Sequence, residues 1–260
     1  MMYERPLTDG TIALLNLGAQ IEAVEAEVER GRATVETRAG LAELISLRGL
    51  IVGHIADYEK AAQIAEQLVD DAPTDARAWV ARARARAGFH RFNDALDDID
   101  VAERLALDVD TANGERAAIL QALGRYDEAV ALREDAAARR SSFEHLAALV
   151  GLYAERGDIE AAERLYAESL SRYRGVSPFP PALLDFQLGL MWMNEGRLQE
   201  ARHSFGAAWC RLPAYAAAKG HLAEVEALLG EVDCAVARLY SLVVSSDDPD
   251  YAAQLARILG

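Results

Sequence analysis

Hydrophobic positions recur along the chain with two periods, a helical one of three and four residues and a longer one of about 34 residues. Six segments align on a single alanine, at intervals of 34, 34, 33, 39 and 34 residues. The aligned residues are Ala61, Ala95, Ala129, Ala162, Ala201 and Ala235. A large apolar residue stands three positions before each alanine, and a glycine stands five positions before four of them. This pattern predicts a stack of helix hairpins with glycine turns.

The repeat resembles the tetratricopeptide repeat, in which the aligned alanine would lie on the second helix of each hairpin. The fifth unit carries most of the pattern, and its matching residues are Leu188, Gly189 and Trp192 on the first helix and Phe205, Ala208 and Pro213 on or after the second. Small residues at two positions of most units should let the paired helices approach closely. The resemblance implies an all-α, right-handed superhelical solenoid of antiparallel helix hairpins.

The resemblance covers residues 42–248 as six repeats, which we place at about 42–75, 76–109, 110–142, 143–181, 182–215 and 216–248. Residues 1–41 are expected to form an N-terminal capping helix, over about residues 8–30, and a linker; residues 249–260 are expected to form a C-terminal capping helix. The alternatives are a dimer seam at the N-terminal helix and a natural chain that continues past Gly260. We accordingly expect a monomer or a weak homodimer.

Two repeats depart from the pattern, and one connection is longer than the others. Val150 replaces a small residue in the fourth repeat, and Arg133 replaces a large apolar residue in the third, so these two repeats should pack less regularly. Between the fourth and fifth repeats the chain carries five extra residues within SRYRGVSPFPP. Its prolines exclude a continuous helix and predict a stiff loop, which is either a spacer or a segment that narrows the groove.

The run WVARARARAG places three arginines on two faces of one helix. Residues two apart on a helix point about 200° apart, so Arg82 and Arg86 should face into the hairpin while Arg84 faces the concave side. Arginine recurs at the position of Arg82 as Arg48 and Arg116, which resembles a bacterial variant of the repeat. In that variant the arginine pairs with an aspartate of the same unit, which here is Asp98.

The amino-acid composition argues against nucleic acid and membranes as partners. The formal net charge is −15, so the electrostatic attraction that drives binding to nucleic acid is absent over most of the surface. No apolar run is long enough to span a membrane, and the first residues lack the pattern of a signal peptide, so we expect a cytoplasmic protein. Cys210 and Cys234 fall too far apart in the predicted register for a disulfide and should be free thiols.

No catalytic or metal-binding motif is present in the sequence. Glycine-rich phosphate loops, nucleophile elbows and metal-ligand spacings are missing, and the five histidines are scattered over different repeats. The acidic stretch DALDDID is interpreted as a mostly solvated helix face rather than as a cation site. We therefore expect a non-enzyme that needs no cofactor and no metal.

The groove lined by the first helices is the expected binding site of the tetratricopeptide family. The candidate groove residues are Arg77, Arg84, Leu183, Phe186, Gln187, Leu190, Met193, Asn194 and His221. The fifth repeat contributes an apolar stripe on its first helix, which is either covered by the proline loop or the C-terminal helix, or open as a binding surface. The basic clamp by which some members hold chaperone C-termini is missing, which argues against a chaperone ligand.

The resemblance and this groove together predict a non-catalytic scaffold or adaptor that binds a protein or peptide. The expected partner is an extended or helical segment with apolar anchors and an acidic flank, with no binding to nucleic acid or membranes. Two alternatives remain open at this point. One is a regulatory sensor that closes on a small signalling peptide or metabolite, and the other is a segment of a larger enzyme or transcription regulator.

Overall fold

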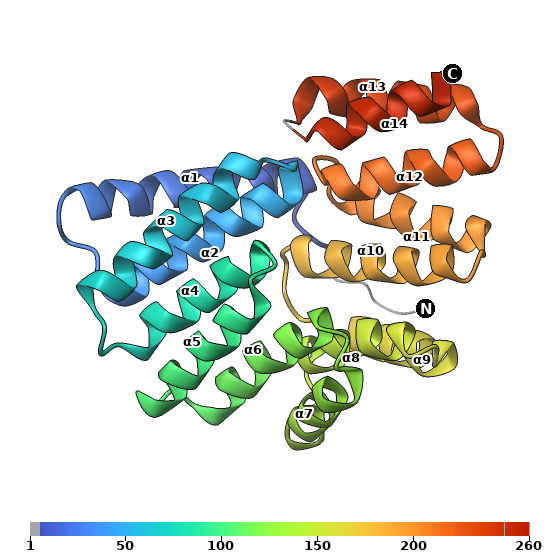
Figure 1. Ribbon diagram of the computed structural model, residues 1–260. Coiled ribbons are helices and arrows are strands. Elements are labelled where there is room, and N and C mark those ends of the chain that lie inside the picture. Colours follow the sequence, from blue (N-terminus) through green and yellow to red (C-terminus); the bar gives the residue numbers. More distant parts are fainter. Residues whose placement is uncertain (1–5, 247, 260) are drawn as a thin grey trace. The chain divides into compact units, whose positions relative to one another are not determined.

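The computed structural model describes residues 6–246 and 248–259, and the part of the chain that it describes forms fourteen helices and no strand (Figure 1). The first seven are α1 (Gly10–Glu29), α2 (Val35–Val52), α3 (Ile55–Asp71), α4 (Ala76–Gly88), α5 (Phe92–Arg104), α6 (Val109–Ala122) and α7 (Tyr126–Arg139). The others are α8 (Phe143–Glu155), α9 (Ile159–Arg172), α10 (Phe179–Asn194), α11 (Leu198–Arg211), α12 (Ala216–Leu228), α13 (Val232–Ser245) and α14 (Pro249–Leu259). The predicted all-α fold of helix hairpins is confirmed.

The helices are divided between two compact units. Of the described residues, 17–49 and 56–141 form one, which we call the Leu17 unit. Residues 6–16, 50–55, 142–246 and 248–259 form the other, the Ser142 unit, to which α8 to α14 belong. The boundary at residues 141 and 142 lies between the third and fourth predicted repeats, which are the two that depart from the repeat pattern. Val150 and Arg133 are the residues that depart from the pattern. Val150 is fully buried, and burial lowers the pKa of the Arg133 guanidinium.

The turns inside the hairpins follow the predicted glycine positions with two differences. Gly124, Gly157, Gly196 and Gly230 adopt φ between +70° and +85°, a region that side chains with a Cβ atom disfavour. His90 takes the same position in the second hairpin at φ 59°. In the first hairpin the left-handed residue is Gly53 (φ 71°), and α3 already begins at Ile55, so that turn comes earlier than the alignment indicates.

The small residues of the repeat lie where paired helices meet. All six aligned alanines are buried, with at most 2% of their surface exposed. At Gly189 in α10 a Cβ atom would lie 2.5 Å from the ring of Phe205 in α11, closer than any van der Waals contact. The close approach predicted from the repeat pattern is therefore confirmed, most directly at Gly189.

The arginines of α4 divide between two faces as the helical spacing predicts. Arg82 donates to both carboxylate oxygens of Asp98 in α5, over 3.1 and 2.8 Å, and Asp98 is only 2% exposed. Arg86 reaches the same carboxylate at 2.8 Å. The pairing of Arg82 with Asp98 is confirmed, and Arg86 is a second partner that the repeat pattern did not indicate.

Arg48 and Arg116 occupy the same repeat position as Arg82, and both also pair with carboxylates. Their partners, however, do not occupy the repeat position of Asp98. Arg48 makes two hydrogen bonds to Asp57, over 2.8 and 2.6 Å, and Arg116 pairs with Asp100 and Glu103 at 2.8 and 2.7 Å. Cys210 and Cys234 are free and exposed, as predicted.

The last helix packs through a tyrosine. Tyr251 of α14 lies in a cluster with Ala216, Ala223 and Leu239, and a Cβ atom on Gly220 would lie 2.7 Å from its ring. Burial and the nearby charges of Asp248 and Asp250 raise the pKa of Tyr251 from 10 to about 12. Helix α14 therefore packs through Tyr251, whose phenol stays neutral at pH values well above those at which a tyrosine usually ionises.

This pKa shift predicts a loss of stability at alkaline pH. Between pH 10 and about 12 the unfolded chain releases the Tyr251 proton while the folded chain keeps it, so stability should fall as the pH rises through this window. The Tyr251→Phe variant, which cannot ionise, should lose less stability over the same window, as measured by denaturant unfolding at a series of pH values. Equal pH profiles for both proteins would contradict the assignment.

Candidate functional site

Helix α10 carries apolar side chains on two faces. Its buried face includes Leu184, Leu188 and Trp192, which belong to the main hydrophobic cluster of the Ser142 unit. A second stripe is only partly buried and consists of Leu183, Phe186, Leu190 and Met193. Pro180 and Pro181 lie in the first turn, where a missing N–H group does not interrupt the helix. The proline-rich stretch therefore begins α10 instead of being wholly a loop.

Aromatic packing holds the middle of this stripe in place. The ring of Phe186 lies 5.5 Å from Phe205, 5.1 Å from Tyr215 and 5.5 Å from His221, measured between ring centroids. His221 in turn stacks on Phe205 at 5.3 Å with an interplanar angle of 16°. Because α10, α11 and α12 all contribute a ring, Phe186 is partly engaged in packing, and its position is fixed.

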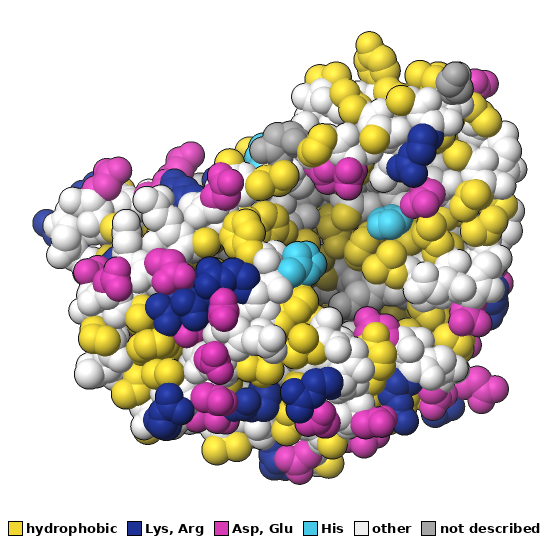
Figure 2. All heavy atoms as spheres, viewed as in Figure 1, with side chains coloured by type: hydrophobic (Ala, Val, Ile, Leu, Met, Phe, Trp, Pro, Cys, Tyr) yellow, Lys and Arg dark blue, Asp and Glu magenta, His cyan; other side chains and the backbone are white. Residues whose placement is uncertain are grey.

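Polar side chains border the stripe. Gln187 and Asn194 are exposed on α10, and His221 on α12 is half-buried with its Nδ1 atom 3.2 Å from Glu224. Figure 2 shows hydrophobic side chains gathered over α10 to α12 on the face in view. We call the stripe with Gln187, Asn194 and His221 the α10 surface. Seven of the nine predicted groove residues thus lie together in the Ser142 unit.

The other two predicted groove residues lie in the Leu17 unit and are already paired. Arg84 of α4 makes ion pairs with Glu43 of α2 and with Glu115 of α6, the latter at 2.6 Å. Arg77 pairs with Asp75 at 2.7 Å and with Glu36 at 3.1 Å. Two carboxylates around each guanidinium leave both clusters net negative. The expectation that these arginines attract an acidic ligand is therefore corrected.

A small hollow adjoins the Arg84 cluster. It has a volume of about 220 Å³ and is lined mainly by small residues of α2, α3 and α4, with Tyr58 and Phe89 as its largest side chains. The carboxylate of Glu43 and the guanidinium of Arg84 lie at the same hollow, so its polar edge is an internal ion pair.

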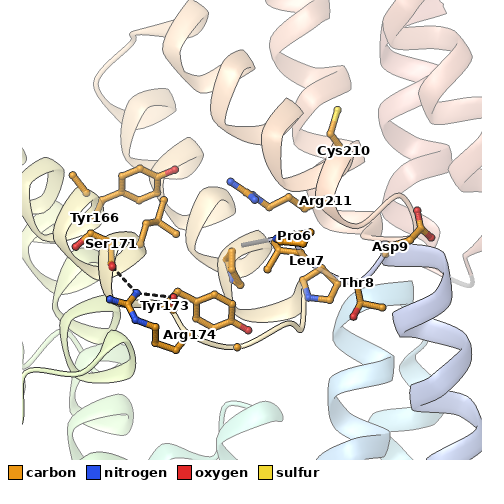
Figure 3. A pocket seen from close by; sticks show the side chains of 16 residues that line it. Pro6, Leu7, Thr8, Asp9, Tyr166, Ser171, Tyr173, Arg174, Cys210 and Arg211 are labelled. Atoms are coloured by element: carbon orange, nitrogen blue, oxygen red, sulfur yellow. Dashed lines mark hydrogen bonds between the residues drawn. The ribbon is translucent and has the colours of Figure 1, made fainter. Parts of the chain in front are cut away.

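A larger pocket lies in the Ser142 unit, and the sequence analysis missed it (Figure 3). Its volume is about 810 Å³, and it is formed by residues 6–10, the last turns of α9 and α11, and the connection from α9 to α10. The amide of Thr8 donates to the carbonyl of Val176 over 2.8 Å, which joins the N-terminal segment to that connection. In the sequence, the five extra residues of the fourth repeat are the one feature that could have indicated this pocket.

A buried carboxylate supports one wall of this pocket. Asp185 of α10 is fully buried and accepts hydrogen bonds from the hydroxyl of Tyr166, over 2.6 Å, and from Nε of Arg211, over 2.7 Å. Burial raises the pKa of the Asp185 carboxyl, against the opposite influence of Tyr166, Arg211 and His203. Tyr166 and Arg211 line the pocket, so Asp185 fixes the orientation of both.

The residues that the structure describes contain neither a metal-binding cluster nor a membrane-spanning helix. No group of three or more His, Cys, Asp or Glu side chains is arranged among the described residues to hold a metal ion, and Asp94, Asp98 and Asp100 of α5 instead pair with arginines. Asp98, which the sequence placed on a mostly solvated face as well as in the pair with Arg82, is buried. No helix among these residues has the length and hydropathy that crossing a bilayer requires.

Comparison with known proteins gives one family match, and it covers a single repeat. A family model described as tetratricopeptide repeat matches residues 144–177, which contain α8 and α9. No curated protein matches the sequence.

Solved structures share the fold at low sequence identity. A tetratricopeptide repeat protein from Parabacteroides merdae is 13% identical with a TM-score of 0.65, and the match covers 94% of this chain and 99% of the other. The pilus biogenesis factor PilW is 21% identical with a TM-score of 0.59, covering 87% and 98%. The Cut9–Hcn1 complex of the APC/C gives 15% identity and a TM-score of 0.63; the match covers 94% of this chain but only 46% of that chain.

These matches agree with the repeat that the sequence predicts. The family model covers one hairpin, and the structural likeness extends over almost the whole chain. The family match is limited to residues 144–177, and the structural likeness over the rest of the chain shows the fold, which is similar to that of tetratricopeptide repeat proteins.

Proposed function

We propose that this chain is a protein-binding module whose partner docks on the α10 surface. The observation that carries the proposal is the stripe of Leu183, Phe186, Leu190 and Met193, which remains partly exposed although the opposite face of α10 is buried. A rigid apolar stripe with polar neighbours suits a helical or extended segment with apolar anchors.

Polar groups beside the stripe suit the backbone of such a segment. Gln187 and Asn194 each carry an amide that both donates and accepts hydrogen bonds, and both are exposed. The ring of Phe186 is preset by its three aromatic neighbours, so little side-chain entropy is lost when a partner packs on it. The acidic flank is not part of this proposal, because Arg77 and Arg84 are held by carboxylates.

The test places charge on the α10 surface without removing packed side chains. In the variant Gln187→Arg with Asn194→Arg, recovery of protein partners from an extract of the source cells should fall at least tenfold, because two bulky cations would border the apolar stripe. The matched control is Tyr240→Arg with Val244→Arg on α13, whose native side chains are 66% and 78% exposed. Thermal melting should show that both variants keep the native fold.

Two outcomes would count against the α10 surface. Full partner recovery by the folded Gln187→Arg, Asn194→Arg variant would remove it as the docking site. Equal losses in this variant and in the α13 control would mean that added charge anywhere on the unit is responsible. A replacement of Phe186 is a poorer test, because its ring supports Phe205 and Tyr215.

A further inference from the structure

The pocket of the Ser142 unit is of the size and kind that binds small molecules. Its volume of about 810 Å³ falls within the range of roughly 300–1,000 Å³ found for ligand sites. It lies against α9 and α11, the second helices of their hairpins, and includes none of the residues of the α10 surface. The inference therefore does not depend on the proposed protein-binding function.

The walls are apolar and stiff. The lining includes Pro6, Leu7, Leu170, Pro178 and Pro181, and three of these are prolines with a fixed backbone φ. The ring of Tyr173, which forms part of the lining, packs against Phe143 at 4.8 Å between ring centroids. A pocket with such walls is largely preformed, so a flat apolar body can enter without much rearrangement.

The charged side chains that line the pocket differ in whether their charge is balanced by a partner. Asp9 accepts the amides of Thr11 and Ile12 at the start of α1, over 2.9 and 3.2 Å, which disperses its charge. Arg211 is held by the buried Asp185. Arg174 instead donates only to backbone carbonyls, those of Ser171 and Tyr173, and no carboxylate of the described residues forms an ion pair with it (Figure 3).

Three hydroxyl groups of the lining already donate hydrogen bonds to the protein. Tyr166 donates to Asp185, Tyr173 to the carbonyl of Ser177 over 2.7 Å, and Ser171 to the carbonyl of Glu168 over 2.6 Å. The strongest donor left for a ligand is therefore a guanidinium group that carries a full charge. A ligand that presents an anionic oxygen at Arg174 would make a charge-assisted hydrogen bond there.

We propose that this pocket binds a small organic monoanion with a flat apolar body, whose carboxylate or sulfonate is recognised by Arg174. The body lies between Leu7, Leu170 and the prolines. A polyanion such as a nucleotide fits poorly, because Arg174 is the one uncompensated cation of the lining that the structure describes, in a chain of net charge −15.

Two dyes that differ in one anionic group provide the test. Anilinonaphthalene sulfonate has a flat apolar body and a sulfonate, and phenylnaphthylamine has the same body without it. Both should bind the full chain, detected by the increase in dye fluorescence. The Arg174→Gln variant should bind the sulfonate dye about tenfold more weakly and the neutral dye as before, because only the charge-assisted contact is lost.

Two further variants complete the experiment, one as a matched control and one whose new side chain fills the pocket. Arg164→Gln removes an exposed arginine of α9 that is not part of the lining, and it should leave both affinities unchanged. Ala167→Phe adds a ring at an exposed position of the lining and should abolish binding of both dyes while the melting temperature stays near the native one. The proposal is overturned if neither dye binds the native chain, if Ala167→Phe binds both, or if Arg174→Gln leaves the preference for the sulfonate dye intact.

Discussion

The Asp98→Ala variant should lose about 3–5 kcal/mol of unfolding free energy, the range for removing one partner of a buried ion pair. The Asp98 carboxylate is 2% exposed and is shared by Arg82 and Arg86, whose side chains are 14% and 17% exposed. Without it, Glu66, whose side chain is half-exposed, is the one acidic partner that both guanidinium groups keep among the described residues. Denaturant unfolding of the variant and the native chain measures the difference.

Replacements of nearby charged residues should lower the unfolding free energy by smaller amounts. Arg82→Ala should cost less than Asp98→Ala, because Arg86 still neutralises the buried carboxylate. Asp94→Ala and Arg84→Ala, which break exposed pairs, should each cost at most about 1 kcal/mol. If Asp98→Ala were no more damaging than Asp94→Ala, the inward assignment of Arg82 and Arg86 would be wrong.

Phe205→Ala should also lower the unfolding free energy by about 3–5 kcal/mol, the usual cost of emptying the volume of a buried phenyl ring. Phe205 has no exposed surface and lies beside Gly189, Phe186 and His221. The cavity would open beneath the α10 surface, so partner recovery should fall together with stability. Thermal melting and the extract experiment measure the two effects.

A pair of replacements identifies the ring as the cause. Gly189→Ala should destabilise the native chain, because its Cβ atom would lie 2.5 Å from the Phe205 ring, which has no free space to move into. In a Phe205→Leu background the same replacement should cost at least about 0.5 kcal/mol less, the lower end for coupled neighbours. Additive costs would mean that the two residues do not meet as the structure has them.

The repeated part of the fold could be predicted because its causes are local and recur. A small residue at Ala95, a glycine such as Gly124 and an arginine such as Arg82 each obey a rule that applies within a single hairpin. Six recurrences at nearly constant spacing remove the ambiguity that one copy would leave. The stripe on α10 was visible for the same reason, since it follows helical periodicity alone.

The parts that sequence reasoning missed depend on contacts between distant segments. Nothing in the repeat indicates that Arg84 lies between acids of the preceding and following hairpins, so the sequence alone predicts that its charge is available to a ligand. The pocket needs residues 6–10 to lie beside the connection around Val176, and no periodicity relates those two stretches. Which face of a helix a distant loop covers is a question of tertiary packing, which a local pattern does not determine.

The division of the chain has a consequence for its biosynthesis. The Ser142 unit includes residues 6–16 and 50–55, which emerge from the ribosome long before residues 142–259 are made. The hydrogen bond from Ser246 to the carbonyl of Gly53 closes a separation of 193 residues, and that from Thr8 to Val176 closes a comparably long one. Individual hairpins can form as they are synthesised, since their contacts are local. This unit, however, can be completed only after residues 248–259 have been made, and until then its earliest segments lack their native neighbours.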